Sequence, residues 1–123
     1  MDSPRLLDHN FAYKGQERIR FAGQITGVEG YMESNASGFL AGLSTARKLL
    51  GQSAPNFPST TAIGALGHYI SNETVTKFQP MNANFGIIDP LGYKIKGKRE
   101  KNLKISERAL EAIDSIKKEL ELS

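Results

Sequence analysis

The segment GQITGVEGYMESNASGFLAG, residues 23–42, restricts the fold of this chain more than any other segment. It places five glycines in twenty positions and directly follows the run RIRFA, residues 18–22. The alternation of polar and apolar side chains in that run predicts a short strand over 18–22. Apolar residues then recur at helical spacing from about Glu29 to Leu50, and Gly51 suits the end of a helix. The apolar stripe expected on this helix comprises Met32, Ala36, Phe39, Leu40, Leu43, Ala46 and Leu50.

A strand, a glycine-rich turn and a helix of small residues suit two different purposes. The glycines and the helix N-terminus can hold a phosphate or another electron-rich group, or they can simply allow a helix to pack closely on a sheet. Gly23, Gly27 and Gly30 give the spacing G-x-x-x-G-x-x-G, which is not the dinucleotide fingerprint, and no Gly-Lys-Ser/Thr completes a Walker loop. The pattern by itself leaves both interpretations open.

The chain as a whole, with 123 residues, predicts one helix-rich α/β domain. We expect an irregular lead-in over 1–17, the strand–turn–helix over 18–50, a loop–helix–loop over 51–93, and a basic segment with a final helix over 94–123. Ser59 or Thr60 is the expected cap of the helix in TAIGALGHYIS, residues 61–71, and Gly64 and Gly67 should weaken that helix. The apolar stripe of the final helix comprises Ile105, Ala109, Ala112, Ile113, Ile116 and Leu120.

Composition excludes several function classes. The chain has no cysteine, so it contains no disulfide, thiolate metal site or thiol nucleophile, and no metal site is expected. No segment has the roughly 18 apolar residues of a membrane span, and the N-terminus lacks the layout of a secretory signal. We therefore expect a cytoplasmic protein without a membrane partner.

Basic residues are concentrated in KIKGKREKNLK, residues 94–104, where Glu100 is the single acidic residue. Such a surface suits an anionic partner, most often a nucleic acid, although a solvated helix face would show the same composition. His68 is likewise open to two interpretations, because a lone histidine on a helix more often serves packing or the surface than catalysis.

Several blocks of the sequence resemble one family in the same order along the chain. FAGQITGVEGYMESNASGFLAG, SPRLL at 3–7, TAIGALGHYI at 61–70, FQPMNANFGI at 78–87 and SERALEAI in the final helix are similar to blocks of the bacterial folate-dependent tRNA (uracil-5-)-methyltransferases, the TrmFO family. The related glucose-inhibited division family, which modifies the wobble uridine of tRNA, has a similar GQ-I-x-G stretch. It typically continues with a Thr-Thr-Gly-Tyr-Glu-Glu type of run where this chain has VEGYMES.

The resemblance implies a fold and a reaction. It implies the C-terminal part of a Rossmann-like FAD-binding domain, with one or two short strands and about three helices. The family moves a methylene group from methylenetetrahydrofolate through FAD to C5 of the T-loop uridine of tRNA, with NAD(P)H as reductant. Its strand–turn–helix lies beside the flavin ring, where a helix N-terminus stabilises the negative charge of reduced flavin.

The resemblance also implies site residues. The expected cofactor-binding residues are Gly23, Gln24, Ile25, Thr26, Gly27, Val28, Glu29 and Gly30, with the N–H groups of residues 25–28 as donors. Glu29 could instead be an exposed carboxylate at the helix start. The candidate folate- or flavin-facing residues are Asn82, Asn84 and Phe85, although both amides could serve their own loop. The candidate tRNA-binding residues are Lys94, Lys96, Lys98, Arg99 and Lys101.

Two parts of the family pattern do not occur in this chain. The dinucleotide-binding glycines that seat the ADP half of FAD do not occur, and catalytic cysteine chemistry is excluded by composition. We therefore expect no catalytic residue here, no tight FAD binding and no activity of the isolated chain. The rest of the parent FAD domain is an expected partner, and self-association through the surface it would cover is expected. The alternative functions are a free-standing basic nucleic-acid-binding or scaffold module and part of a wobble-uridine flavoprotein.

Overall fold

The computed structural model describes residues 1–75 and 77–120. In chain order the elements are α1 (Ser3–Leu6), β1 (Ala12–Tyr13), β2 (Gln16–Arg20), the 3-10 turn η1 (Gln24–Thr26), α2 (Tyr31–Leu49), α3 (Ala62–Ile70) and α4 (Lys98–Glu119). The expected helix-rich α/β class, with one or two short strands and about three helices, is confirmed: the described residues form two short strands and three helices longer than α1. Residues 76 and 121–123, which belong to the expected segments 51–93 and 94–123, lie outside the described residues.

The expectation of an irregular lead-in over 1–17 is wrong, because a hydrogen-bonded turn orders this segment. The Asp8 carboxylate accepts the N–H groups of Asn10 at 2.8 Å and Ala12 at 3.0 Å. This Asx-type turn holds Phe11 at a φ of +66° with its side chain buried. β1 then pairs antiparallel with β2, in the register Ala12 to Arg20 and Tyr13 to Gln16.

The strand occurs two residues earlier than expected, over Gln16–Arg20 instead of 18–22. The hairpin turn fixes this register, because Tyr13 and Gln16 are partners on either side of the Lys14–Gly15 turn. Phe21 still bonds to the neighbouring segment, through an N–H donated to the Phe11 carbonyl at 3.0 Å. The sequence alone did not reveal the second strand, which has only two residues.

Helix α2 has the expected bounds within two residues, but its buried face matches the expected stripe only in part, through Leu40 and the partly buried Leu43. Its buried residues are Ser37, Leu40, Ala41 and Ser44. Met32 and Phe39 from the expected stripe are 78% and 54% exposed. The small polar side chains face the β2–η1 segment because they bond to it: Gly23 N–H donates to Ser37 Oγ at 2.7 Å, and the Arg20 guanidinium donates to Ser44 Oγ at 2.8 Å.

Helix α3 depends on the two glycines that we expected to weaken it. A Cβ at Gly64 would meet the backbone carbonyls of Phe57 and Pro58, and a Cβ at Gly67 would meet the backbone carbonyl of His9. The glycines therefore allow two loops to lie directly against this helix. The N-cap is Thr61, not Ser59 or Thr60, and its hydroxyl accepts the Gly64 N–H at 3.0 Å.

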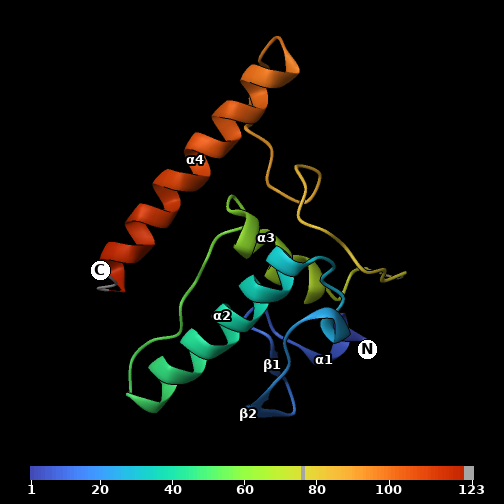
Figure 1. Cartoon of the computed structure of the whole chain (residues 1–123), viewed down its shortest axis with the longest axis vertical. Coiled ribbons are helices and arrows are strands. Elements are labelled where there is room, and N and C mark those ends of the chain that lie inside the picture. Colours follow the sequence, from blue (N-terminus) through green and yellow to red (C-terminus); the bar gives the residue numbers. More distant parts are fainter. Residues whose placement is uncertain (76, 121–123) are drawn as a thin grey trace.

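Helix α4 runs along one side of the molecule and is reached by the long loop 78–97 (Figure 1). Ile105 and Ile116 are its buried residues, and the Arg108 guanidinium ties the helix to the carbonyls of Asp89 and Pro90. The core that these elements share comprises Leu7, Phe11, Val28, Leu40, Ala41, Phe57, Leu66, Ile70, Ile116 and Leu120.

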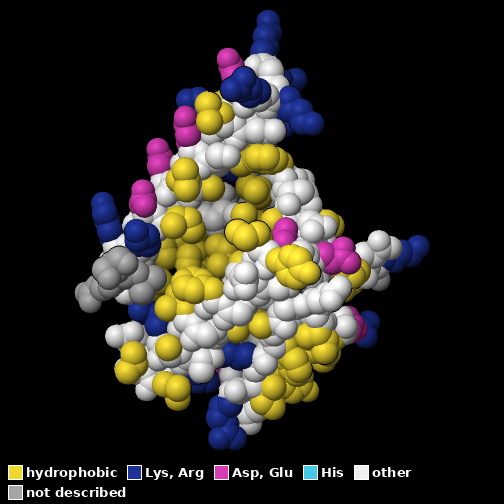
Figure 2. Space-filling view, viewed as in Figure 1, with side chains coloured by type: hydrophobic (Ala, Val, Ile, Leu, Met, Phe, Trp, Pro, Cys, Tyr) yellow, Lys and Arg dark blue, Asp and Glu magenta, His cyan; other side chains and the backbone are white. Residues whose placement is uncertain are grey.

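Apolar surface lines the hollow between α4 and the rest of the chain (Figure 2). One cavity of about 420 Å³ lies against Phe39, Phe57 and Ile113, and another of about 390 Å³ lies against Phe85, Ile88 and Leu110. No helix among the described residues combines the length and apolar character that crossing a bilayer would require.

Candidate functional site

The turn between β2 and α2 needs glycine at the three positions that the sequence marks. Gly23, Gly27 and Gly30 have φ values of +81°, +100° and +106°, a backbone region that L side chains rarely adopt. Between the first two glycines, η1 is closed by the Thr26 N–H and hydroxyl, which both donate to the Gly23 carbonyl, at 3.0 and 2.7 Å. The first role of these glycines is therefore to allow the positive φ values that the turn requires.

Two of these glycines also leave room for neighbours from elsewhere in the chain. A Cβ at Gly27 would overlap the ring of Phe78, and a Cβ at Gly30 would overlap the Glu33 carboxylate and approach the Asn82 amide. At Gly23, by contrast, no described atom beyond the two chain neighbours would lie within 4 Å of a Cβ. The backbone at Gly23 therefore presents an open side that a planar ligand could approach closely.

The turn is tied to loop 78–86, more than fifty residues away in sequence. Met81 N–H donates to the Gly27 carbonyl at 2.8 Å, and Glu29 N–H donates to the Met81 carbonyl at 3.0 Å. The Asn82 amide donates to the Glu29 carbonyl at 2.7 Å. The structure thus brings together the glycine turn and loop 78–86, which the sequence singled out separately. They meet in a short parallel bridge between Val28 and Met81.

The first turn of α2 carries both an uncapped N-terminus and a carboxylate. Gly30 is the N-cap and provides no side-chain hydrogen bond, so the first N–H groups of the helix stay available for an acceptor. The Glu33 carboxylate lies in this first turn and accepts the Ala83 N–H at 3.1 Å. The positive end of the helix dipole already stabilises the Glu33 carboxylate. A second anion bound at this helix start would therefore be stabilised less.

The individual turn residues face different surroundings. Thr26, Gly27 and Val28 are buried, Glu29 is half-buried, and Gln24 and Ile25 are exposed. Of the four expected N–H donors, those of Thr26 and Gly27 are engaged inside η1, with the carbonyls of Gly23 and Gln24. The exposed edge of the turn therefore consists of Gln24 and Ile25, together with the backbone of Gly23.

The two asparagines of the candidate folate loop bond to their own surroundings. The Asn84 amide donates to the Asn82 carbonyl at 2.9 Å, and Asn84 Oδ1 accepts the Gly86 N–H at 2.7 Å. Together with the Asn82 bond to Glu29, these contacts match the interpretation in which both amides hydrogen-bond within the protein and order the loop. Phe85 differs from them because the residue is 45% exposed.

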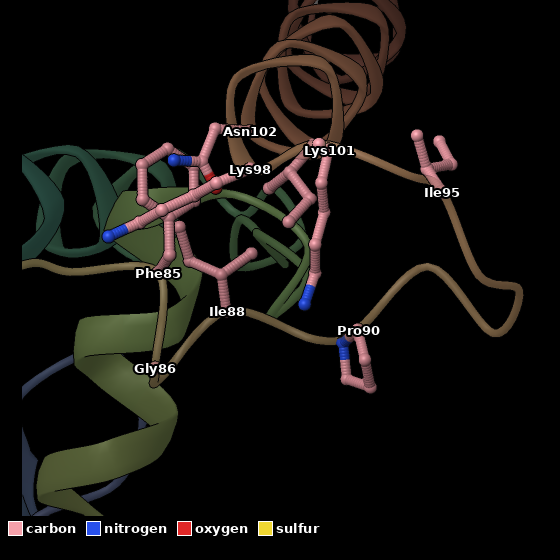
Figure 3. A pocket seen from close by; sticks show the side chains of 10 residues that line it. Phe85, Gly86, Ile88, Pro90, Ile95, Lys98, Lys101 and Asn102 are labelled. Atoms are coloured by element: carbon pink, nitrogen blue, oxygen red, sulfur yellow. The ribbon is translucent and has the colours of Figure 1, made fainter.

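Phe85 lines a cavity of about 640 Å³ at the start of α4 (Figure 3). Lys98, Lys101 and Asn102 lie on the α4 side of this cavity, and Ile88 and Pro90 lie on the loop side. Lys94, Lys96 and Arg99 do not line it. The structure thus divides the basic cluster and places two of its lysines beside an aromatic ring.

A histidine pair was missed by the sequence interpretation. His9 stacks on His68, with ring centroids 5.0 Å apart and planes 5° from parallel. The pKa of His9 is lowered mainly by burial and further by the neighbouring His68, while Asp8 acts in the opposite direction. Nothing in the local sequence indicates that residues 9 and 68 meet. Among the described residues, no group of three or more His, Cys, Asp or Glu side chains could hold a metal ion.

Comparison with known proteins first gives a broad class. The family model described as "Glucose inhibited division protein A" matches residues 1–53, which include α1, the hairpin, the glycine turn and all of α2. The match therefore ends just after the elements that build the turn.

More specific relatives match almost the whole chain. The methylenetetrahydrofolate–tRNA-(uracil-5-)-methyltransferase TrmFO of Anoxybacillus flavithermus is 50% identical over 120 residues, which are 98% of this chain and 28% of that protein. TrmFO of Streptococcus gordonii is 54% identical over 90% of this chain and 25% of its own length. TrmFO of Bacillus subtilis is 48% identical over 96% of this chain and 27% of its own length. The chain is thus homologous to a portion of the TrmFO proteins, and it spans about a quarter of their length.

Proposed function

We propose that this chain forms the flavin-facing part of a TrmFO-type tRNA (uracil-5-)-methyltransferase. The observation that carries the proposal is the Gly23–Gly30 turn, whose three left-handed glycines open one backbone face at Gly23 and lock the other face to loop 78–86. Homology along 98% of the chain to a protein named for this reaction supports it.

The residues of the turn fit a planar, electron-rich ring. The open backbone at Gly23 allows close approach, Gln24 offers an amide at the exposed edge, and the uncapped start of α2 offers N–H groups. FAD bound there would carry the methylene group and electrons from methylenetetrahydrofolate and NAD(P)H. The chain's own part is to position the ring and to favour negative charge at its polar edge. Ile25, 59% exposed, supplies an apolar contact beside it.

The tRNA partner is proposed on the basic cluster at residues 94–104. Phosphate contacts come mainly from Lys and Arg, and these residues lie on the surface at the start of α4. A free-standing basic nucleic-acid-binding module would explain this charge equally well. It would not explain the glycine turn or the homology along the whole chain, so we favour the methyltransferase. A tRNA substrate would place the protein in the cytoplasm.

The isolated chain is proposed to lack activity and tight FAD binding, because it presents surfaces that another part of a domain would cover. Tyr31 is 93% exposed at the start of α2, and the exposed apolar residues further along that helix and at its C-cap are Met32, Phe39, Leu49 and Leu50. In a TrmFO-type protein the remaining three quarters of the sequence would supply the covering surface and the ADP side of the cofactor site.

A chimera tests this proposal directly. The matching 118-residue portion of Bacillus subtilis TrmFO is replaced with that of this chain, and 5-methyluridine is mapped in tRNA after incubation with methylenetetrahydrofolate and NADPH. We expect methylation at the T-loop uridine to remain detectable well above the background of the protein that lacks the portion. A folded chimera without methylation would contradict the proposal, and modification at the wobble uridine would support the alternative flavoprotein.

A further inference from the structure

The cavity at the start of α4 combines an apolar floor with positive charge at one edge. Its floor is formed by Phe85, Ile88, Pro90, Ile95 and Ile105, and its volume of about 640 Å³ lies within the range of sites that enclose small organic groups. Phe85 is 45% exposed as a residue and contributes an aromatic surface to this floor. An aromatic side chain left half-exposed in a hollow is available for stacking.

The charged edge is formed by two lysines one helical turn apart. Lys98 and Lys101 are related by i and i+3, so both side chains extend from the same face of α4 toward the loop that carries Phe85, Ile88 and Pro90 (Figure 3). Ion pairs within the described residues involve neither of them, whereas Lys104 pairs with Glu107 at 3.5 Å. Their charge is therefore available to an external anion.

The cavity lining also includes a polar side chain from α4. Asn102 is half-buried and lines the cavity one residue after Lys101. Its amide can both donate and accept, which suits the polar edge of a heterocyclic base. The cavity therefore matches the three parts of a nucleotide. The aromatic ring suits a flat base, the amide suits its hydrogen-bonding edge, and the two lysines suit its phosphate.

We propose that this cavity captures an unpaired nucleotide of an RNA, with the base stacked on Phe85 and the adjoining phosphates held by Lys98 and Lys101. A paired base is inaccessible to such a ring, so the site selects single-stranded or flipped-out nucleotides. The inference rests on the proposed tRNA partner and adds to it a residue-level site, distinct from the glycine turn, that recognises RNA structure.

The chain offers a spectroscopic test because it contains no tryptophan. Phe85→Trp introduces a single fluorophore in the cavity, and Tyr93→Trp introduces the same fluorophore at a 63% exposed position that does not line it. Each variant is titrated with a 12-nucleotide single-stranded oligouridylate and with a blunt RNA duplex. Saturable quenching at residue 85 by the single strand, with little at residue 93 and little from the duplex, is the expected result.

Affinity measurements with matched charge variants complete the test. By anisotropy of a labelled oligouridylate, Lys98→Gln with Lys101→Gln should weaken binding at least tenfold and reduce the salt slope by about 1.4, because each phosphate contact on a single strand contributes about 0.7. The control pair Lys96→Gln with Arg99→Gln removes equal charge outside the cavity and should weaken binding much less. Phe85→Leu should weaken binding about 5- to 150-fold, as expected for loss of one stacked base. Phe85→Tyr keeps an aromatic ring and should bind about as tightly as the unchanged chain.

Three results would overturn the inference. They are equal effects of the Lys98/Lys101 and Lys96/Arg99 double variants, equal binding of duplex and single strand, or full displacement of the oligouridylate by micromolar folic acid. The last result would assign the cavity to a small molecule. Circular dichroism checks that each variant is folded. Because flavin content and methylation of the TrmFO chimera depend on the glycine turn, a failure here would leave the proposed function standing.

Discussion

The backbone of Gly27 lies against the ring of Phe78, so close that a Cβ at residue 27 would overlap the ring. Phe78 in turn packs at a tilt on Tyr69 of α3, with ring centroids 5.6 Å apart. The glycine turn, loop 78–86 and α3 therefore form one packed unit.

Replacing Gly27 should disrupt this unit. Gly27→Val combines a disfavoured φ of +100° with displacement of the Phe78 ring, and strain of this kind costs about 1–3 kcal/mol before the packing loss is added. Gly42→Ala is the control, since that glycine lies inside α2 and a Cβ there would have no described atom within 4 Å beyond its chain neighbours and the adjacent helix backbone. It should stabilise the chain by about 0.5–1 kcal/mol. Urea denaturation measures both free energies of unfolding, and equal effects would contradict the packing described.

The Thr61 hydroxyl should stabilise α3 as its N-cap. Thr61→Ala removes the acceptor of the Gly64 N–H and should lower the free energy of unfolding by about 1 kcal/mol. Thr60→Ala, one residue away and outside the cap, should have little effect. Denaturation curves that give the larger loss to Thr60 would restore the cap that the sequence first suggested.

The stacked histidines should make stability depend on pH. Burial, the main cause, lowers the pKa of His9 in the folded chain below the ordinary value of about 6.5. A base whose pKa falls on folding stabilises the folded state fully above its unfolded pKa, and this stabilisation is lost as the pH falls through the folded pKa. The midpoint of thermal unfolding should therefore decrease from about pH 7 to pH 5.

His9→Gln should flatten this pH profile. His68→Gln leaves the burial of His9 in place and should only reduce the slope. The pKa values of Glu17 and Glu73 are also lowered, by hydrogen bonds from Lys48 and Lys14, but these exposed carboxylates act at more acidic pH. An unchanged slope in the His9 variant would assign the effect to other groups.

The exposed apolar side chains of α2 should promote self-association of the isolated chain. Sedimentation velocity should show a mass that grows with concentration, because Tyr31, Met32 and Phe39 present apolar surface along one helix. Met32→Glu with Phe39→Glu should reduce this association without lowering thermal stability, since neither side chain belongs to the core. A monomer at the highest soluble concentration would count against an uncovered interface.

Sequence reasoning predicted the glycine turn well because its requirements are local. The clustered glycines indicate a turn between a strand and a helix, and the bounds of α2 follow from apolar spacing and Gly51. The buried face of α2 could not be predicted in the same way. Ser37 and Ser44 are buried because they bond to Gly23 and Arg20, and hydrophobicity cannot reveal such partners.

The site as a whole depends on contacts between distant segments. The bonds that join Gly27 and Glu29 to Met81, and the stacking of His9 on His68, connect residues more than fifty positions apart. Composition locates the basic cluster, but only the folded chain separates Lys98 and Lys101, which line the Phe85 cavity, from Lys96 and Arg99. Whether the turn residues bind a flavin stays a prediction.

The FAD content of the TrmFO chimera tests the central claim most directly. Absorbance at 450 nm against protein concentration should give close to one FAD per chimera, an unchanged ratio for Gly42→Ala, and a ratio reduced at least fivefold for Gly27→Val in protein that is still folded. Full FAD content in the folded Gly27→Val chimera would contradict the assignment of the glycine turn to the flavin.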